Sequence, residues 1–92
     1  MFFLTYVATH NAGGLHVMLP DFNLHARAAA VVEVPDRIQD AIAEGYRGNV
    51  PKSSCLEDLQ ADERFRGGWW LWLNIDVDDV GRRRRIRSRD RQ

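Results

Sequence analysis

The chain has 92 residues, of which 45% are hydrophobic and 28% are charged, values typical of one small soluble globular domain. No apolar run approaches the roughly 20 residues that a membrane-spanning helix needs. The first ten residues lack the basic start and the small-residue cleavage site of a signal peptide. A single cysteine, Cys55, excludes an internal disulfide and a cysteine-rich zinc site. We therefore expect a cytoplasmic protein that does not enter a membrane.

The formal net charge of zero hides two parts of opposite charge. Residues 1–80 carry twelve acidic and six basic residues, a net charge of −6, whereas residues 81–92 carry seven arginines and one aspartate, a net charge of +6. Dense like charge with little apolar material is typical of a disordered segment. The sequence thus predicts an acidic folded domain over residues 1–80 and a basic tail over residues 81–92, disordered from about Gly81.

The first third of the chain predicts a β-hairpin. Residues Phe2 to Thr9 are rich in aromatic and β-branched side chains, and Leu15 to Pro20 alternate between apolar and other residues. The segment His10 to Gly14 contains the Asn and Gly residues that tight turns require. Residues Asn23 to Arg27 are a candidate for a short third strand.

Three histidines lie in or near this hairpin. His16 and His25 lack a partner at the spacing typical of metal ligands, and His10 falls in the turn. We expect all three to be surface or hydrogen-bonded residues rather than metal ligands or catalytic bases.

The next segment allows two interpretations. Apolar residues from Val31 to Ile42 fall on one helical stripe, which favours a helix over about residues 29–44 with Pro35 near its start. Alternatively, residues 28–34 form a strand and the helix begins at Pro35 or Asp36. We prefer the longer helix.

A second, short helix of about two turns is expected after residue 53. Ser54 and Glu57 have the spacing of a capping box, in which the serine side chain and the glutamate satisfy the first backbone amides of the helix. Leu56 and Leu59 would be buried, and Phe65 would enter the core before the chain turns.

The segment Gly67 to Val80 has the clearest pattern in the chain, because it alternates with a period of two. Its odd positions are mainly aliphatic and predict the buried face of a strand. Its even positions run from Trp70 and Trp72 to Asp76 and Asp78. Large aromatic groups beside carboxylates are typical of protein interaction surfaces, although a second layer of the same domain would also explain the tryptophans.

The order of these parts resembles that in the HicB antitoxin family. The residues that carry the resemblance lie in three groups: Val17, Pro20, Asp21 and Phe22; Ser54, Leu56, Glu57, Leu59, Ala61, Asp62 and Phe65; and Trp70, Ile75, Asp76, Val77 and Asp78. The resemblance implies an α+β domain with a degraded ribonuclease-H-like fold. Its sheet would have three to four mainly antiparallel strands, with one main helix and one short helix.

The resemblance also implies a function. HicB-like proteins of type II toxin–antitoxin systems bind and neutralise a small basic HicA-type toxin that cleaves mRNA. Family members often continue into a DNA-binding domain that represses their own operon. Residues 81–92 keep only a remnant of such a segment and have no room for a helix pair, so we expect no folded DNA-binding module there.

Three functions from different classes follow from these observations. The first is toxin binding, with five residues as the candidate interface: Trp70, Trp72, Asp76, Asp78 and Asp79. The second is weak, non-specific nucleic-acid binding through the tail, with five arginines as candidates: Arg82, Arg83, Arg84, Arg85 and Arg87. The third and least favoured is a metal-dependent nuclease that uses the aspartates with Asp21 or Glu33.

We expect a non-catalytic binding protein without a cofactor or a bound metal. The small core and the tryptophan-bearing face also predict self-association, most simply as a dimer.

Overall fold

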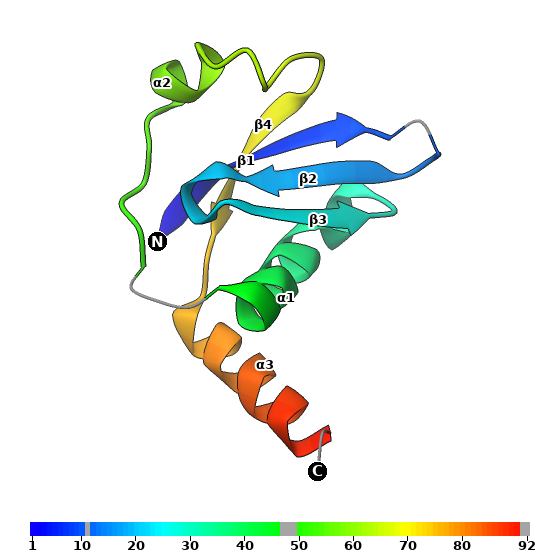
Figure 1. Ribbon diagram of the computed structural model, residues 1–92, viewed down its shortest axis with the longest axis vertical. Helices are drawn as coiled ribbons and strands as arrows, with labels where there is room; N and C mark the ends of the chain where they lie inside the picture. The colour runs from blue at the N-terminus through cyan, green and yellow to red at the C-terminus, as the bar shows by residue number, and fades with distance from the viewer. Residues whose placement is uncertain (11, 47–49, 91–92) are drawn as a thin grey trace.

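The computed structural model describes residues 1–10, 12–46 and 50–90, with side chains as far as Ile86. Four antiparallel strands form one sheet in the order β3-β2-β1-β4 (Figure 1). The strands are β1 Phe2–Thr9, β2 Leu15–Leu19, β3 Leu24–Ala28 and β4 Trp69–Asn74. The helices are α1 Val34–Gly45, α2 Leu56–Gln60 and α3 Val77–Asp90, with short 3-10 turns η1 Pro20–Phe22 and η2 Val31–Glu33. The predicted α+β class and strand number are confirmed.

The hairpin of β1 and β2 forms as the sequence predicts. Tyr6 faces Met18, and Thr9 faces Leu15 at the turn. Gly13 and Gly14 have positive φ values of 95° and 74°, which glycine adopts without the steric cost that other residues meet. The third strand, β3, pairs with β2, so that β3 and β4 form the two edges of the sheet.

The core lies between one face of the sheet and α1 (Figure 1). Alternate residues of the central strands point toward the helix, and the helix presents residues three and four positions apart, as an amphipathic helix does. The fully or nearly fully buried members from β1, β2 and α1 are Phe3, Val7, Val17, Leu19, Val34, Ile38 and Ile42.

The start of α1 differs from both interpretations of the sequence. The helix begins at Val34, after the 3-10 turn Val31–Glu33, and Ala28 closes β3. The preferred helix from residue 29 is therefore wrong over its first five residues, and residues 29–34 form no strand either. The 3-10 turn explains the misleading stripe, since it continues the helical course of the chain into Pro35, which is tolerated in the first turn.

The segment 50–68 covers part of the other face of the sheet, and the predicted capping box in it is wrong. Ser54 lies before the first residue of α2, and its hydroxyl donates to Asp21 Oδ1 at 2.5 Å instead of capping the helix. The Ser54 amide donates to Asp21 Oδ2 at 3.1 Å. Leu56 and Leu59 are only half-buried, whereas Phe65 is 6% exposed, as expected. The serine therefore ties the segment to the end of β2.

The last strand is shorter than its pattern predicts. β4 ends at Asn74, and α3 begins at Val77, whose side chain is 56% exposed rather than buried. Residues 81–90 belong to α3, so the prediction of disorder from Gly81 is wrong for them, and residues 91–92 lie outside the described residues. Within the described ranges, no helix combines the length and the apolar character needed to cross a membrane.

Candidate functional site

The two candidate tryptophans of β4 lie on the outer face of the sheet, which we define as the face turned away from α1. Trp70 is paired with Tyr6, and its ring packs against the rings of Tyr6 and Phe65 at centroid distances of 5.1 Å each. Trp72 is paired with Leu4 and keeps 53% of its surface exposed. A second layer thus covers Trp70 and leaves Trp72 open, so Trp70 is a packing residue and Trp72 is available for contact.

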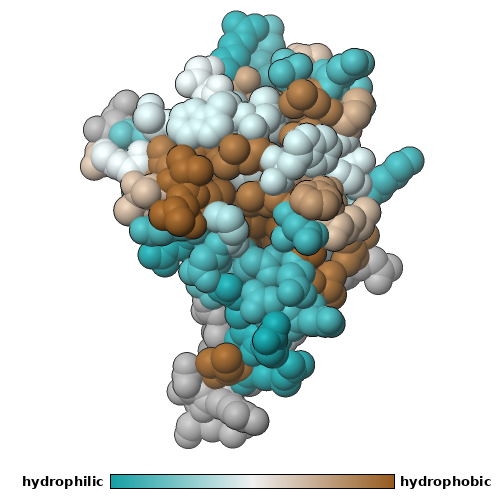
Figure 2. Space-filling view, turned by 180° about the vertical axis from the view of Figure 1, so that it is seen from behind, coloured by the Kyte–Doolittle hydropathy of each residue, from teal (hydrophilic) through white to brown (hydrophobic). Residues whose placement is uncertain are grey.

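Trp72 belongs to an exposed apolar surface along the open edge of β4. Phe2, two residues before the Leu4 partner, shares its face and is 57% exposed. We call Phe2 and Trp72 the β4 edge surface. Trp69 is 37% exposed, but it is paired with Val7 and therefore lies on the opposite face of the sheet. Figure 2 shows the molecule from behind, where apolar and near-neutral residues form a band across the upper half, with hydrophilic residues at the top and in the lower half. Sequence reasoning missed Phe2, because its position beside Trp72 depends on the pairing of β1 with β4.

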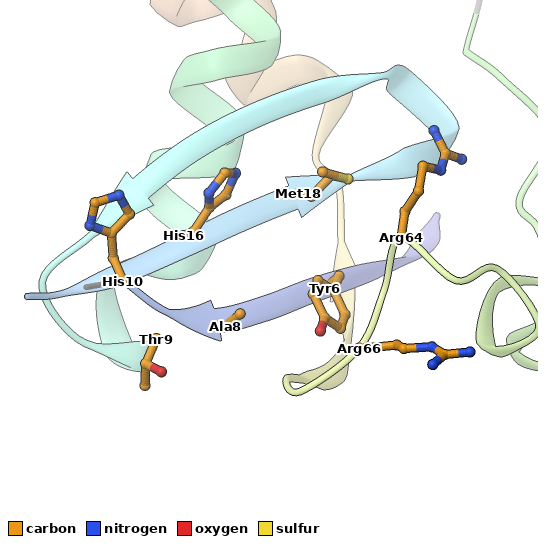
Figure 3. Close-up of a pocket in the computed structure, with 8 residues that line it drawn as sticks. All are labelled: Tyr6, Ala8, Thr9, His10, His16, Met18, Arg64 and Arg66. Atoms are coloured by element: carbon orange, nitrogen blue, oxygen red, sulfur yellow. The ribbon is translucent and has the colours of Figure 1, made fainter. Parts of the chain in front are cut away.

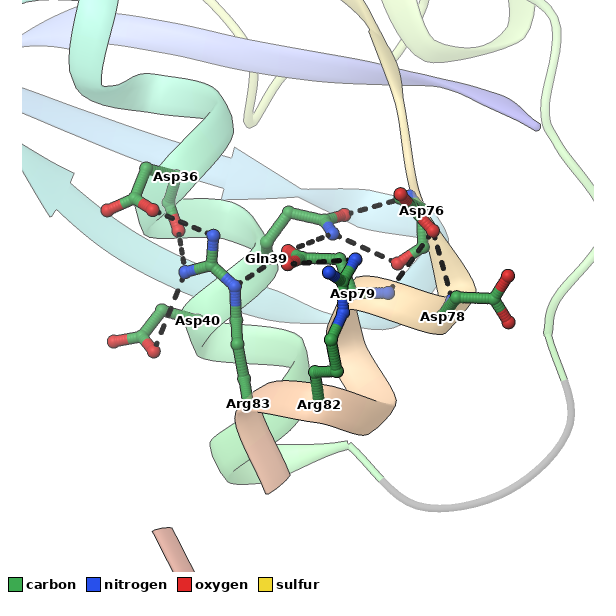
Figure 4. A network of polar contacts seen from close by, with 8 residues as sticks. All are labelled: Asp36, Gln39, Asp40, Asp76, Asp78, Asp79, Arg82 and Arg83. Atoms are coloured by element: carbon green, nitrogen blue, oxygen red, sulfur yellow. Dashed lines mark hydrogen bonds and ion pairs between the residues drawn. The ribbon is translucent and has the colours of Figure 1, made fainter. Parts of the chain in front are cut away.

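The aspartates do not continue the line of tryptophans, which corrects the predicted acidic and aromatic strand face. Asp76 precedes α3, and its Oδ1 accepts from the amides of Asp78 and Asp79 at 3.0 and 3.2 Å. A side-chain oxygen that accepts from the first helical amides is the hydrogen bond of an N-cap. Asp78 points into solvent, whereas Asp79 points toward α1 (Figure 4).

The side chain of Gln39 in α1 holds the start of α3 in place. Its side chain is 7% exposed and makes three hydrogen bonds. The amide nitrogen donates to the Asp76 carbonyl and to Asp79 Oδ2, both at 3.0 Å, and the amide oxygen accepts from the Asp76 backbone at 3.1 Å. The hydrogen bond from Gln39, and after it that from Arg83, lowers the pKa of Asp79. The carboxylate is therefore held in its charged form at the helix N-terminus, where negative charge is favourable.

Arg83 connects α3 to the first turns of α1 (Figure 4). Its guanidinium lies 2.8 Å from Asp36, 2.7 Å from Asp79 and 3.8 Å from Asp40. The hydrogen bond to Asp36 is the largest influence that raises the pKa of Arg83. Such a network draws the basic helix onto the acidic domain, so Arg83 acts as a structural residue.

Arg84 is also used inside the domain. Its guanidinium donates to the carbonyls of Ile42 and Ala43 at 3.3 Å each and to the carbonyl of Tyr46. The last carbonyls of a helix have no partners within the helix, and a cation is favourable there. Of the five predicted nucleic-acid residues, Arg82 and Arg85 stay exposed, and the side chain of Arg87 lies outside the described part.

The carboxylates considered for a nuclease do not meet. Asp21 accepts from Ser54, and Glu33 pairs with Arg37 at 3.5 Å. Asp76 caps α3 and Asp79 contacts Gln39 and Arg83, whereas Asp78 points into solvent. Among the described residues, no three His, Cys, Asp or Glu side chains come together as metal ligands would. The arrangement gives two-metal chemistry no site in this part of the chain.

No family model and no curated protein matches this sequence. The solved structures that are similar in fold include the following two. The crystal structure of the Burkholderia pseudomallei antitoxin HicB matches at a TM-score of 0.67 with 19% identity, over 86% of this chain and 66% of that chain. The crystal structure of its N-terminal domain matches at a TM-score of 0.66 with 20% identity, over 84% of this chain and 100% of that chain.

The match thus spans less than two thirds of the longer antitoxin, and all of its N-terminal domain. This agrees with the resemblance that the sequence motifs indicate. The chain has the fold of the N-terminal domain of the HicB antitoxin.

Proposed function

We propose that this chain binds and neutralises a small basic toxin of the HicA type, which cleaves mRNA, in the cytoplasm. The observation that carries the proposal is the fold shared with the HicB antitoxin and with its N-terminal domain. The proposed activity is binding without catalysis. Except for the exposed Asp78, the carboxylates that a nuclease would need are engaged in structural contacts, which supports this choice.

The β4 edge surface is the best candidate for the contact. Trp72 is large, amphipathic and 53% exposed, beside the equally exposed Phe2. Tryptophan is enriched among the residues that dominate binding energy, and truncating such an anchor costs about 2 kcal/mol or more. Because β4 is an edge strand, its free backbone groups are also open to a strand of the partner. Trp70 contributes by packing beneath this surface rather than by contact.

Charge supports the choice of a basic partner. Residues 1–80 carry a net charge of −6. Part of the basic charge of α3 is engaged by Asp36 and Asp79, so Asp78 remains as the exposed acid at the start of that helix. Acidic groups around an apolar contact steer a basic partner and mainly affect its rate of association. Nucleic-acid binding through α3 is the weaker alternative, because Arg83 and Arg84 are already engaged.

The test is a titration of purified wild-type and Trp72→Ala chains against the small basic protein encoded beside this one, with oligomeric state measured in parallel. We expect Trp72→Ala to weaken the affinity about 30-fold, the equivalent of about 2 kcal/mol. Val32→Ala is the matched control, since Val32 is 85% exposed but lies outside the β4 edge surface. Its affinity should equal that of the wild type.

Two outcomes would change the assignment. If Trp72→Ala dissociates a dimer and keeps full affinity for the partner, the β4 edge surface is the dimer contact that the sequence predicts, and the toxin binds elsewhere. If the wild-type chain binds no such basic protein, the proposed function is wrong.

A further inference from the structure

A cluster of three histidines and an arginine lies on the outer face of the hairpin. His16 of β2 is the cross-strand partner of Arg27, and Met18 is the partner of His25, so these side chains share one face. His16 Nε2 lies 3.0 Å from His25 Nδ1, and Arg27 Nη2 lies 2.9 Å from His10 Nε2. The cluster is independent of the β4 edge surface, which lies at the other edge of the sheet.

The side chains of this cluster offer more hydrogen-bond donors than acceptors. His10 Nδ1 accepts from the Ala12 amide at 3.0 Å, while its Nε2 faces the guanidinium of Arg27. Arginine only donates, and a neutral imidazole has one donor and one acceptor nitrogen. His10 therefore cannot satisfy both contacts, and one ring nitrogen presents a hydrogen to another donor. An added acceptor between His10 and Arg27 would remove the conflict.

A hollow of about 290 Å³ opens beside the cluster (Figure 3). Its lining includes Tyr6, His10 and His16 from the hairpin, and Arg64 and Arg66 from the segment before β4. Tyr6 is 7% exposed, and its buried hydroxyl has no hydrogen-bond partner among the described residues. A buried hydroxyl without a partner is costly, so the wall of the hollow contains an unmet hydrogen bond.

The charges around the hollow favour an anion. The pKa of His16 is lowered, first by burial and then by the nearby His25, Arg27 and His10. No acidic group contributes to this shift. Across the hollow, Arg64 is paired with Asp62 at 2.6 Å, whereas Arg66 meets Glu63 only at 3.5 Å. The histidine side of the hollow thus has hydrogen-bond donors and the cation Arg27, and among the described residues no carboxylate is bonded to them.

We propose that His10 and His16, at one end of the hollow, together with Arg27, which contacts His10 beside it, bind a dianionic oxyanion, the phosphate group of a ligand of about mononucleotide size. A phosphate presents three oxygens that accept several hydrogen bonds, which matches the excess of donors. The volume of about 290 Å³ lies at the lower end of ligand sites. Protonation of His16 adds a donor and a positive charge, so anion binding takes up a proton.

The test uses sulfate as the first probe, because its charge stays constant over the range in which phosphate titrates. Calorimetric titration at fixed ionic strength should show sulfate binding that tightens at least about fivefold from about pH 8 to about pH 6, since one coupled proton gives up to about tenfold per pH unit. Arg27→Gln should weaken sulfate binding about tenfold or more. Arg27→Lys, which keeps the charge, should retain part of the affinity. His16→Gln should bind sulfate with little dependence on pH.

Arg37→Gln is the matched control, because it removes the same charge from α1, where Arg37 pairs with Glu33. If Arg27→Gln and Arg37→Gln lose the same amount of sulfate affinity, the effect is a general attraction between charges and the proposal is wrong. A titration with Zn²⁺ tests the alternative that the histidines bind a metal. Zn²⁺ binding that weakens on acidification, without any sulfate binding, would assign the histidines to a metal instead. A further titration with uridine 5′-monophosphate identifies the source, since tighter binding than inorganic phosphate indicates a nucleotide and equal binding a free phosphate.

Discussion

Replacement of Gln39 by methionine should destabilise the protein strongly although it conserves the volume of the side chain. Gln39 is 7% exposed, and its amide makes three hydrogen bonds to the start of α3. Methionine keeps the apolar contacts but leaves the Asp76 N–H without its partner and the Asp76 carbonyl with only the Val80 amide as a donor. Each lost hydrogen bond costs about 1 kcal/mol, and the one to the charged Asp79 costs about 2. We therefore expect Gln39→Met to lower the free energy of unfolding by about 2 to 4 kcal/mol.

Urea unfolding followed by circular dichroism measures the loss, and hydrogen exchange locates it. If Gln39 anchors α3, the amides of residues 77–86 should exchange much faster in the variant, whereas those of β1 should change less. Gln60→Ala is the control, because Gln60 is exposed at the end of α2 and its replacement should cost no more than about 0.5 kcal/mol. A Gln39→Met chain as stable as the Gln60→Ala chain would refute this role of Gln39.

Two further predictions concern stability. Gly68→Ala should cost about 3 kcal/mol in urea unfolding, because an added Cβ would lie 2.2 Å from the Val7 carbonyl oxygen. Gly13→Ala, which places its Cβ in open space, should lower the free energy of unfolding by only about 1 kcal/mol. A larger loss for Gly13→Ala than for Gly68→Ala would contradict this reasoning. The pKa of His16 is lowered in the folded state, so the unfolded chain binds more protons and stability falls as pH drops below about 6.5. His16→Gln should lose less stability between about pH 7 and about pH 5, and an unchanged slope would exclude His16.

The sheet and the core were predictable because their signals are local. The turn glycines Gly13 and Gly14 and the alternation in the two hairpin strands specify the β1–β2 pairing over short distances in sequence. The stripe of α1, with Ile38 and Ile42, specifies its buried face. Each of these patterns depends on the residues of one element and its neighbour.

The end of β4 was predicted wrongly because two local signals compete there. Alternation of apolar and polar residues continues through Val77, but Asp76 is also an N-cap residue followed by acidic residues in a first helical turn. The cap prevails because Gln39, far away in the sequence, holds the Asp76 backbone. Alternation alone contains no information about that partner.

The roles of the arginines also depend on distant partners. Arg83 meets Asp36 from α1, and Arg84 reaches the carbonyls at the end of the same helix. Composition treats all arginines of residues 81–92 alike, whereas packing separates Arg83 and Arg84, which are engaged in contacts, from the exposed Arg82 and Arg85. The same holds for the tryptophans, because the rings of Tyr6 and Phe65 cover Trp70 and leave Trp72 exposed.

The open edge of β4 makes the unbound protein prone to aggregation. The strand reads WWLWLN and contains no charge and no proline, the features by which edge strands usually avoid pairing with other chains. Any ligand that covers the edge stabilises the native chain by mass action and also removes a template for aggregation. The soluble amount of this protein should therefore rise with the concentration of any partner that binds this edge, and the proposed basic toxin would stabilise the chain in this way.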